Sequence, residues 1–195
     1  MHGWGMTEMS PLGTATVKTK EMEGMDIEAR YDLQQKQGKA FFGVEMTIAD
    51  DDGNELPQDG VAFGRLLVKG PTIVDTYFKS NDSAKDENGW FDTGDVAKIH
   101  PEGYMEIVDR SKDVIKSGGE WISSIDLENA AVGPPGVAEA CVIGVLHTKW
   151  DERPLLLIVK ANNEDPSKED INKYLEDKVA KWWLPDDIVF VEELP

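Results

Sequence analysis

Four polar side chains in the amino-terminal part of the chain carry groups suited to a ligand with phosphates and vicinal hydroxyls. Glu8, directly after Thr7, offers a carboxylate to a magnesium ion that bridges phosphates, because Mg²⁺ commonly takes one or two carboxylates and keeps waters. Asp95 could accept both hydroxyls of a cis-diol, and Arg110 could donate to a ribose oxygen or a phosphate. Each also fits a structural role, with Asp95 capping a turn and Arg110 pairing with a neighbouring carboxylate.

Thr7 and Glu8 close the hexapeptide GWGMTE, which begins at Gly3. Gly3 and Gly5 flank the indole of Trp4, and a glycine lets the backbone approach a ligand closely because it has no Cβ. A surface loop anchored by a buried Trp4 would produce the same pattern. Taken alone, the hexapeptide favours the loop.

A second candidate site lies in residues 103–128, GYMEIVDRSKDVIKSGGEWISSIDLE. Alternation over residues 104–108 predicts a strand, and the charged run 109–113 follows it at once. A short strand at 114–116 then leads into the glycine turn 117–119. Such a density of charges and glycines at a break predicts a hinge or a ligand site, and a solvated turn between strands is the alternative.

The elements that would position the first group of residues are short strands joined by glycine turns. Residues 42–48 and 64–70 alternate as strands, whereas residues 10–39 are polar and weakly periodic, with a short helix expected at 26–35. Short strands at close spacing are typical of a small barrel or a twisted antiparallel sheet, which we expect to extend to about residue 109.

The acidic turn after residue 49 resembles the start of a calcium-binding loop, with Asp50, Asp52 and Asn54 at the ligand spacing. Such a loop needs a bidentate glutamate at its twelfth position, where this chain has Val61. We therefore expect no calcium site at this turn.

Beyond the charged run the pattern changes to alternating strands and helices, which predicts a small α+β domain. Ser123 with Asp126 marks a helix start at 124, and Ser167 with Asp170 marks a second one with an acidic capping box. The first helix is expected at 124–131, and strands at 138–145, 155–160 and 188–191. The second helix should turn a core face made of Ile171, Tyr174, Leu175, Val179 and Trp182, and residues 183–185 should end it.

Composition limits the classes of partner. A hydrophobic content of 40% and six Trp in 195 residues indicate a packed core. The formal charge of -18 argues against nucleic acid and anionic membranes as partners, and any phosphate ligand would need local cations, backbone N–H groups or a metal. The single cysteine, Cys141, lies in an apolar run and reads as a small buried hydrophobic residue. Without a membrane-spanning run or a signal peptide, a soluble cytoplasmic protein is expected.

Five motifs occur in an order and spacing that resembles the adenylate-forming superfamily of acyl-CoA synthetases, peptide-synthetase adenylation domains and luciferases. These are GWGMTE, the strand 64–70, WFDTGDVA, DRSKDVIKSGGEW and WWLP. The run DRSKDVIKSGGEWISSIDLE is most similar to the medium- and long-chain fatty acyl-CoA synthetase branch. The resemblance covers essentially the whole chain.

The resemblance implies an α+β fold in two parts. Residues 1–110 would be the C-terminal part, a distorted antiparallel β-barrel, of a large N-terminal domain, and residues 111–195 a small, mobile α+β C-terminal domain. It also implies a reaction in two steps. A carboxylic acid attacks the α-phosphate of ATP to give an acyl-adenylate and pyrophosphate, and the thiol of coenzyme A then displaces AMP. ATP or AMP, Mg²⁺ and coenzyme A would be the cofactors, with a fatty acid as the substrate.

Roles follow for the matching residues of this sequence. Trp4 would stack on the adenine, Thr7 would contact the α-phosphate, and Glu8 would hold Mg²⁺. Asp95 would bind the ribose diol with help from Arg110. The implied nucleotide site comprises Gly3, Trp4, Gly5, Thr7, Asp95, Ile107 and Arg110.

Residues of the second candidate site would serve the domain movement and the thioester step. Lys112 matches the hinge position of the family, and Lys116 matches a lysine used in the thioester step. The implied coenzyme A contacts are Lys116, Gly118, Gly119, Glu120 and Trp121. A hinge needs an uncrowded backbone, and a pantetheine arm needs glycines where it passes the chain.

The chain also departs from the family pattern. The phosphate-binding loop that should precede Gly3 and the lysine loop that should follow residues 193–195 are both absent, so we expect an enzyme fragment with negligible adenylation activity. Two alternatives stay open: an aryl- or short-chain-acid–CoA ligase, and a non-catalytic nucleotide- or coenzyme-A-binding module of the same fold. A homodimer is also open.

Overall fold

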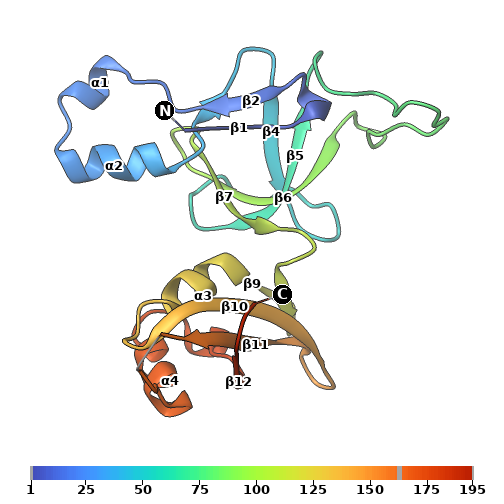
Figure 1. The fold of residues 1–195 in the computed structure, drawn as a ribbon. Helices are drawn as coiled ribbons and strands as arrows, with labels where there is room; N and C mark the ends of the chain where they lie inside the picture. Colours follow the sequence, from blue (N-terminus) through green and yellow to red (C-terminus); the bar gives the residue numbers. More distant parts are fainter. Residues whose placement is uncertain (1, 162–163, 195) are drawn as a thin grey trace. The chain divides into compact units, whose positions relative to one another are not determined.

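The computed structural model describes residues 2–161 and 164–194. The chain divides into two compact units, Met1–Ser111 and Lys112–Pro195 (Figure 1). This boundary lies within the charged run that interrupts the strand pattern. Each unit has its own hydrophobic core and is described by itself.

Two open antiparallel sheets form the first unit. The larger sheet has the order β4-β5-β6-β7, and its strands are Glu45–Ala49, Phe63–Lys69, Phe91–Ile99 and Met105–Arg110. The smaller sheet has the order β1-β2-β3, and its strands are Gly3–Gly5, Leu12–Ala15 and Lys39–Ala40. Within the described residues neither sheet closes into a barrel, so the twisted-sheet form of the expectation is the one observed.

Strand β5 shows why these residues form a sheet with one buried face. Gly64, Leu66 and Val68 point inward and alternate with half-buried residues, as the period of a strand requires. The core beneath it combines residues of the larger sheet with Met9 and Ile73, and Trp4 of the smaller sheet packs against it half-buried. Its buried members are Met9, Ile48, Leu66, Val68, Ile73, Phe91, Ala97, Ile99 and Met105.

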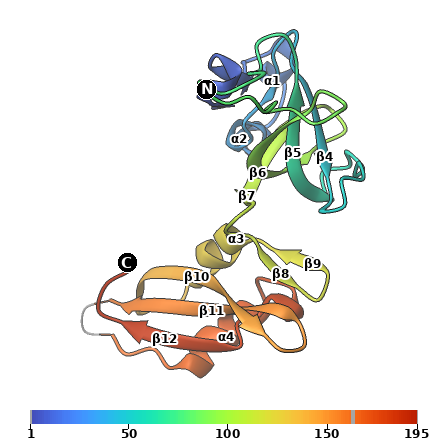
Figure 2. The same cartoon turned by 90° about the vertical axis from the view of Figure 1, so that its right-hand side faces the viewer.

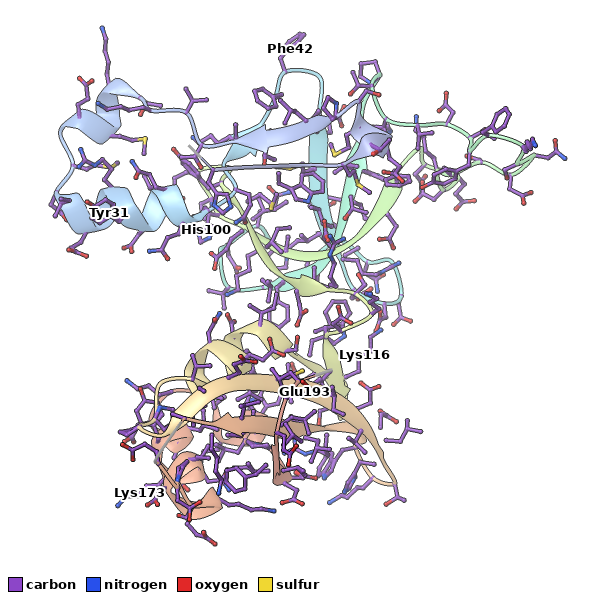
Figure 3. The ribbon with its side chains drawn as sticks, in the orientation of Figure 1. Tyr31, Phe42, His100, Lys116, Lys173 and Glu193 are labelled. Atoms are coloured by element: carbon purple, nitrogen blue, oxygen red, sulfur yellow. The ribbon has the colours of Figure 1, made fainter. Side chains whose placement is uncertain are left out.

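The segment between β2 and β3 of the smaller sheet contains two helices, α1 (Lys20–Glu23) and α2 (Ile27–Gln35). Only α2 was predicted, and Asp26 caps it by accepting a hydrogen bond from the N–H of Ala29 at 3.0 Å. The strand predicted at 42–48 begins later, at Glu45. Phe42 is fully exposed on the loop before it, where its ring points away from the sheet (Figure 3).

The second unit is a mixed sheet with helices (Figure 2). The strands are β8 (Ile115–Ser117), β9 (Glu120–Ile122), β10 (Val137–His147), β11 (Asp151–Lys160) and β12 (Asp187–Val191), and the helices are α3 (Ser124–Ala131), α4 (Lys168–Glu176) and the 3-10 helix η2 (Lys181–Trp183). The order is β10-β11-β8-β9, with β12 parallel to β11. All three strands predicted beyond residue 130 are present, although β10 and β11 are longer than expected.

Both predicted helix starts in the second unit are confirmed. The side chain of Ser123 accepts from the N–H of Asp126 at 3.1 Å, and Ser167 with Asp170 forms a capping box. The predicted length of the second helix was wrong. It ends at Glu176, so Trp182 lies in η2 and is 42% exposed, while Trp183 packs against the core.

Two minor expectations concern Cys141 and membrane spans. Cys141 on β10 is partly rather than fully buried, and burial, with Glu128 nearby, raises the pKa of its thiol. A raised pKa keeps the thiol protonated, which agrees with an unreactive cysteine. Among the described residues no helix is long and apolar enough to cross a bilayer.

Candidate functional site

Three of the predicted residues meet in the first unit, around the carboxylate of Asp95. The indole N–H of Trp4 donates to Oδ2 at 2.7 Å, and Nη1 of Arg110 pairs with Oδ1 at 2.7 Å. Asp95 is 4% exposed, and Arg110 stands directly opposite it in the β6–β7 register. Trp4 thus reaches a buried charge that lies 91 positions away in the sequence, and Arg110 contacts the same charge.

A bulge in β6 aims Asp95 at this position. The register advances two residues along β5, from Arg65 to Leu67, while β6 advances four, from Asp92 to Val96. Gly94, inside the bulge, has φ +73°, a conformation that L side chains rarely adopt. The sequence Asp-Thr-Gly-Asp therefore supplies both the bend and the carboxylate that the bend presents.

Trp4 is held by the contact between β1 and β2. A Cβ on Gly13 would lie 2.5 Å from Cζ3 of Trp4, and a Cβ on Gly5 would lie 2.1 Å from the carbonyl oxygen of Pro11. Gly5 and Gly13 therefore let β2 approach the indole and its strand. The sequence suggested that Gly5 leaves room for a ligand. In the structure its missing side chain lets the backbone of Pro11 pack against it.

Thr7 and Glu8 lie on the 3-10 helix η1 (Thr7–Met9), which buries Met9 in the core. The carbonyl oxygen of Glu8 accepts from the N–H of Val74 at 2.8 Å, and its Oε1 accepts from the hydroxyl of Tyr77 at 3.1 Å. Burial and this bond to Glu8 raise the pKa of the Tyr77 phenol. Glu8 is half-buried and is held through both its backbone carbonyl and its side chain, and its carboxylate is the kind of ligand that Mg²⁺ takes.

Ile107 lies in β7, half-buried against the core, and its N–H donates to Oε1 of Gln37 at 2.6 Å. Sequence reasoning missed Gln37 and Tyr77, because both come from loops whose paths depend on long-range pairing. Within residues 2–161 and 164–194, the partners of the Asp95 carboxylate are Trp4 and Arg110, and Ile107, Thr7 and Glu8 are not among them. Trp4, Asp95 and Arg110 thus form one group in direct contact, and Ile107, Thr7 and Glu8 stand outside that group.

The second group of predicted residues occupies the β8–β9 hairpin. Gly118 and Gly119 form its two-residue turn with φ +61° and +87°, the pair of positive angles that a type I′ turn requires. Lys116 stands opposite Trp121 in the register, with Nζ 5.2 Å from the ring centroid. Figure 3 marks Lys116 on this hairpin. Glu120 is exposed next to the turn.

Two clefts adjoin the hairpin. One, of about 370 Å³, is lined by Ser117, Gly118, Glu120, Trp150, Arg153, Trp182 and Asp186. The other, of about 500 Å³, is lined by Lys116, Leu146, His147, Thr148, Asp151 and Glu152. The residues from 146 to 153 were not predicted as site residues, because only the β10–β11 pairing brings their turn beside the hairpin.

Lys112, the predicted hinge, is exposed and is the first residue of the second unit. The N–H of Ser111, just before it, donates to the carbonyl oxygen of Gly94 at 3.0 Å. The backbone hydrogen bond of Ser111 thus closes the first unit, and Lys112 follows it as an exposed residue at the boundary.

Two family models match the chain. Residues 1–78 match the AMP-binding enzyme family, and residues 126–195 match the AMP-binding enzyme C-terminal domain. The solved structures that resemble this one include ATP-bound MatB from Rhodopseudomonas palustris, with a TM-score of 0.78 and 29% identity, covering 98% of this chain and 36% of that one. The o-succinylbenzoate CoA synthetase from Bacillus subtilis also has a TM-score of 0.78, at 28% identity over 100% of this chain and 38% of that one.

Curated relatives match along the full chain. A 3-methylmercaptopropionyl-CoA ligase of Ruegeria lacuscaerulensis is 55% identical over 100% of this chain and 36% of its own length. A medium-chain-fatty-acid–CoA ligase of Ectopseudomonas oleovorans is 45% identical with the same coverage, and a trans-cinnamate:CoA ligase of Petunia hybrida is 36% identical over 100% of this chain and 35% of its own. The chain therefore spans about a third of the length of these relatives.

Proposed function

We propose that this chain, which belongs to the adenylate-forming superfamily, supplies part of the nucleotide site and the C-terminal domain of an ATP-dependent acid–CoA ligase. The convergence of Trp4 and Arg110 on the buried carboxylate of Asp95 carries the proposal. A carboxylate fixed on two sides, beside an aromatic ring and a cation, is suited to a ribose and its base. The names of the curated relatives support the reaction class.

In the adenylation step the acid's carboxylate oxygen attacks the α-phosphorus of ATP, and pyrophosphate leaves with the electrons of the broken P–O bond. Asp95 would orient the nucleotide through its ribose diol, since two carboxylate oxygens still have acceptor sites beyond those used by Trp4 and Arg110. The side chain of Arg110 is 59% exposed, so it can shift toward the sugar while its charge stays near Asp95. Trp4 would then contact the base and Thr7 the α-phosphate.

Glu8 would hold the magnesium ion, which supplies charge neutralisation at the phosphates when bound. Its backbone bond to Val74 and its side-chain bond to Tyr77 fix the carboxylate in one place. That matters in a chain with a formal charge of -18, because an anionic phosphate needs local compensation.

In the thioester step the thiol of coenzyme A, having lost its proton, attacks the acyl carbon, and AMP leaves. The β8–β9 hairpin would serve this step. Gly118 and Gly119 give a pantetheine arm a backbone without side chains, and Lys116 with Glu120 would line its path. Lys112 would be the pivot between the two steps, in keeping with its exposed position at the start of the second compact unit.

For the substrate we favour an aliphatic carboxylic acid, fatty acids included. The identity to relatives named for 3-methylmercaptopropionate and medium-chain fatty acids is 55% and 45%, against 36% for the relative named for trans-cinnamate. An aryl acid is the runner-up. A nucleotide-binding module without ligase activity is the second candidate, because the Asp95 trio would bind a nucleotide with or without catalysis.

A chimera tests the ligase. In it this chain replaces the matching third of the Ruegeria lacuscaerulensis relative, and pyrophosphate release and thioester formation are measured with aliphatic acids of graded length and with trans-cinnamate. Thioester formation with aliphatic acids is expected, and preference for cinnamate would favour the aryl alternative. A chimera that folds but catalyses neither step would overturn the proposed ligase function.

Calorimetry with AMP tests the nucleotide site on the chain alone. Asp95→Ala should abolish binding, while Asp82→Ala, which removes the same charge from an exposed loop residue, should retain it. Circular dichroism checks that both variants fold. Equal affinities for the wild type and Asp95→Ala would remove Asp95 from the site.

A further inference from the structure

The β8–β9 hairpin is joined to the rest of its sheet by little backbone pairing. In the part of the chain that the structure describes, the register between β11 and β8 consists of one residue pair, Asp151 with Ser117, and the N–H of Gly118 in the turn donates to the carbonyl oxygen of Trp150 at 2.9 Å. The base of the hairpin is anchored differently, because Ile115 and Ile122 are buried in the core. The stretch that carries Lys116 therefore needs side chains to fix its position.

Glu152 supplies such a contact. Its Oε2 accepts a hydrogen bond from the backbone N–H of Lys116 at 2.9 Å. In a hairpin with a two-residue turn, the pair flanking the turn exchanges hydrogen bonds and the next pair points its N–H groups outward. Lys116 belongs to that next pair. The carboxylate thus stands where a neighbouring strand would provide a carbonyl oxygen.

The surroundings of Glu152 hold the carboxylate in this place. Gly144 on β10 leaves room for it, since a Cβ there would lie 3.1 Å from Oε2. Asp151 has φ +65°, and across it the N–H of Glu152 donates to the carbonyl oxygen of Trp150 at 2.8 Å. This is a γ-turn, a strained form for a residue with a side chain. Gly144 thus leaves space for the carboxylate, and the γ-turn fixes the backbone from which the Glu152 side chain extends.

Arg153, which follows Glu152, contacts Ser117, which follows Lys116 on β8. Its Nη1 donates to Oγ of Ser117 at 3.2 Å and to the carbonyl oxygen of Trp182 at 2.7 Å, and its Nη2 donates to that of Leu184 at 2.9 Å. Its Nε donates to Asp186 at 2.8 Å. Arg153 therefore attaches β8 through a second set of side-chain bonds, separate from the bond made by Glu152.

We propose that Glu152 is a positioning residue for the thioester step: by holding the backbone of Lys116 it fixes where the ammonium group of that lysine lies. The inference rests on the proposed function, because it needs Lys116 to act in that step. Lys116 already lies across from Trp121, with Nζ 5.2 Å from its ring centroid, so a small rotation of the strand would move the ammonium group. Misplacement of a catalytic group by about 1 Å can cost about 100-fold in rate.

The first test uses the chain itself and does not depend on catalysis. Amide hydrogen exchange at Lys116 is followed by NMR in the wild type, Glu152→Ala and Glu152→Gln. Exchange should accelerate at least about tenfold in Glu152→Ala and remain close to the wild type in Glu152→Gln, whose amide oxygen can still accept. Glu139→Ala, which removes the same charge from an exposed position on β10, is the matched control. Unchanged exchange in Glu152→Ala would overturn the proposal.

The second test uses the chimera and separates the two steps. With preformed acyl-adenylate, Glu152→Ala should slow thioester formation about 10- to 100-fold, Glu152→Gln should restore most of the rate, and pyrophosphate release should be unchanged. Equal losses in both steps would indicate a merely structural role and overturn the proposal. If the wild-type chimera is inert, the ligase function and the link to catalysis both fail, while the exchange experiment still decides whether Glu152 holds Lys116.

Discussion

Replacing Arg110 by methionine would isolate the cost of leaving the Asp95 carboxylate buried without its cation. The side chains of this pair differ in exposure, at 59% for Arg110 and 5% for Asp95. The cation can return to water, whereas the carboxylate cannot. Methionine keeps much of the aliphatic volume, so the variant removes the charge and its hydrogen bond more than the packing.

The magnitude follows from what remains around Asp95. A hydrogen bond to a charged group contributes about 1.5–3 kcal/mol, and breaking a fully buried ion pair costs about 3–5 kcal/mol. Here Arg110 is largely exposed and Trp4 still donates to Oδ2 at 2.7 Å. The expected cost therefore lies in the range for a single hydrogen bond to a charged group. We expect a loss of about 2 kcal/mol in the free energy of unfolding of the first unit, or about a 30-fold rise in its unfolded fraction.

Native-state amide exchange is the suitable assay, because the chain has two units and its unfolding need not be two-state. Amides of β6 and β7 report on the first unit, and those of β11 on the second. Exchange in β6 and β7 should accelerate about 30-fold, and exchange in β11 should not change. Lys18→Met is the matched control, since its partner Glu23 is 64% exposed and the pair should contribute little.

Two results would refute this reasoning. An effect of Arg110→Met no larger than that of Lys18→Met would mean that the buried carboxylate does not depend on its cation. An equal acceleration in β11 would mean that the variant disturbs the whole chain and does not report on the Asp95 site.

Two further predictions concern titration. The Ser167 hydroxyl lowers the pKa of Asp170, and Lys168 lowers the pKa of Asp187, below their ordinary value of 3.8. The stability that these two carboxylates contribute is therefore present above about pH 4 and is lost as the pH falls through their lower folded pKa values. Asp170→Asn should make the free energy of unfolding, measured by urea titration with circular dichroism, fall less steeply with decreasing pH. An unchanged dependence on pH would contradict the capping box. Burial raises the pKa of Tyr77 and Glu8 adds to the rise, so Glu8→Gln should lower it, and so should Mg²⁺ if it binds Glu8. The tyrosinate absorbance measures this, with Tyr77→Phe identifying the signal, and a pKa insensitive to both changes would remove Glu8 as the metal ligand.

The sequence by itself determined the local features. Ser123, Ser167 and Asp26 cap helices because a short polar side chain at a helix start satisfies a free N–H wherever it occurs. The alternation in β5 and the paired glycines of the β8–β9 turn are equally local, since strand period and positive φ are properties of neighbouring residues. The order of five motifs also indicated the family, and the family models match the chain.

Only the tertiary structure decided how these features meet. Trp4 and Asp95 are 91 residues apart, and no local rule predicts that the indole N–H should reach that carboxylate. The end of α4 at Glu176 and the exposure of Trp182 were likewise mispredicted, because a helical period cannot show where the core stops. Glu152 carried no motif at all. Its role arises from a turn that brings β11 beside β8, where a carboxylate takes the place of a missing strand bond.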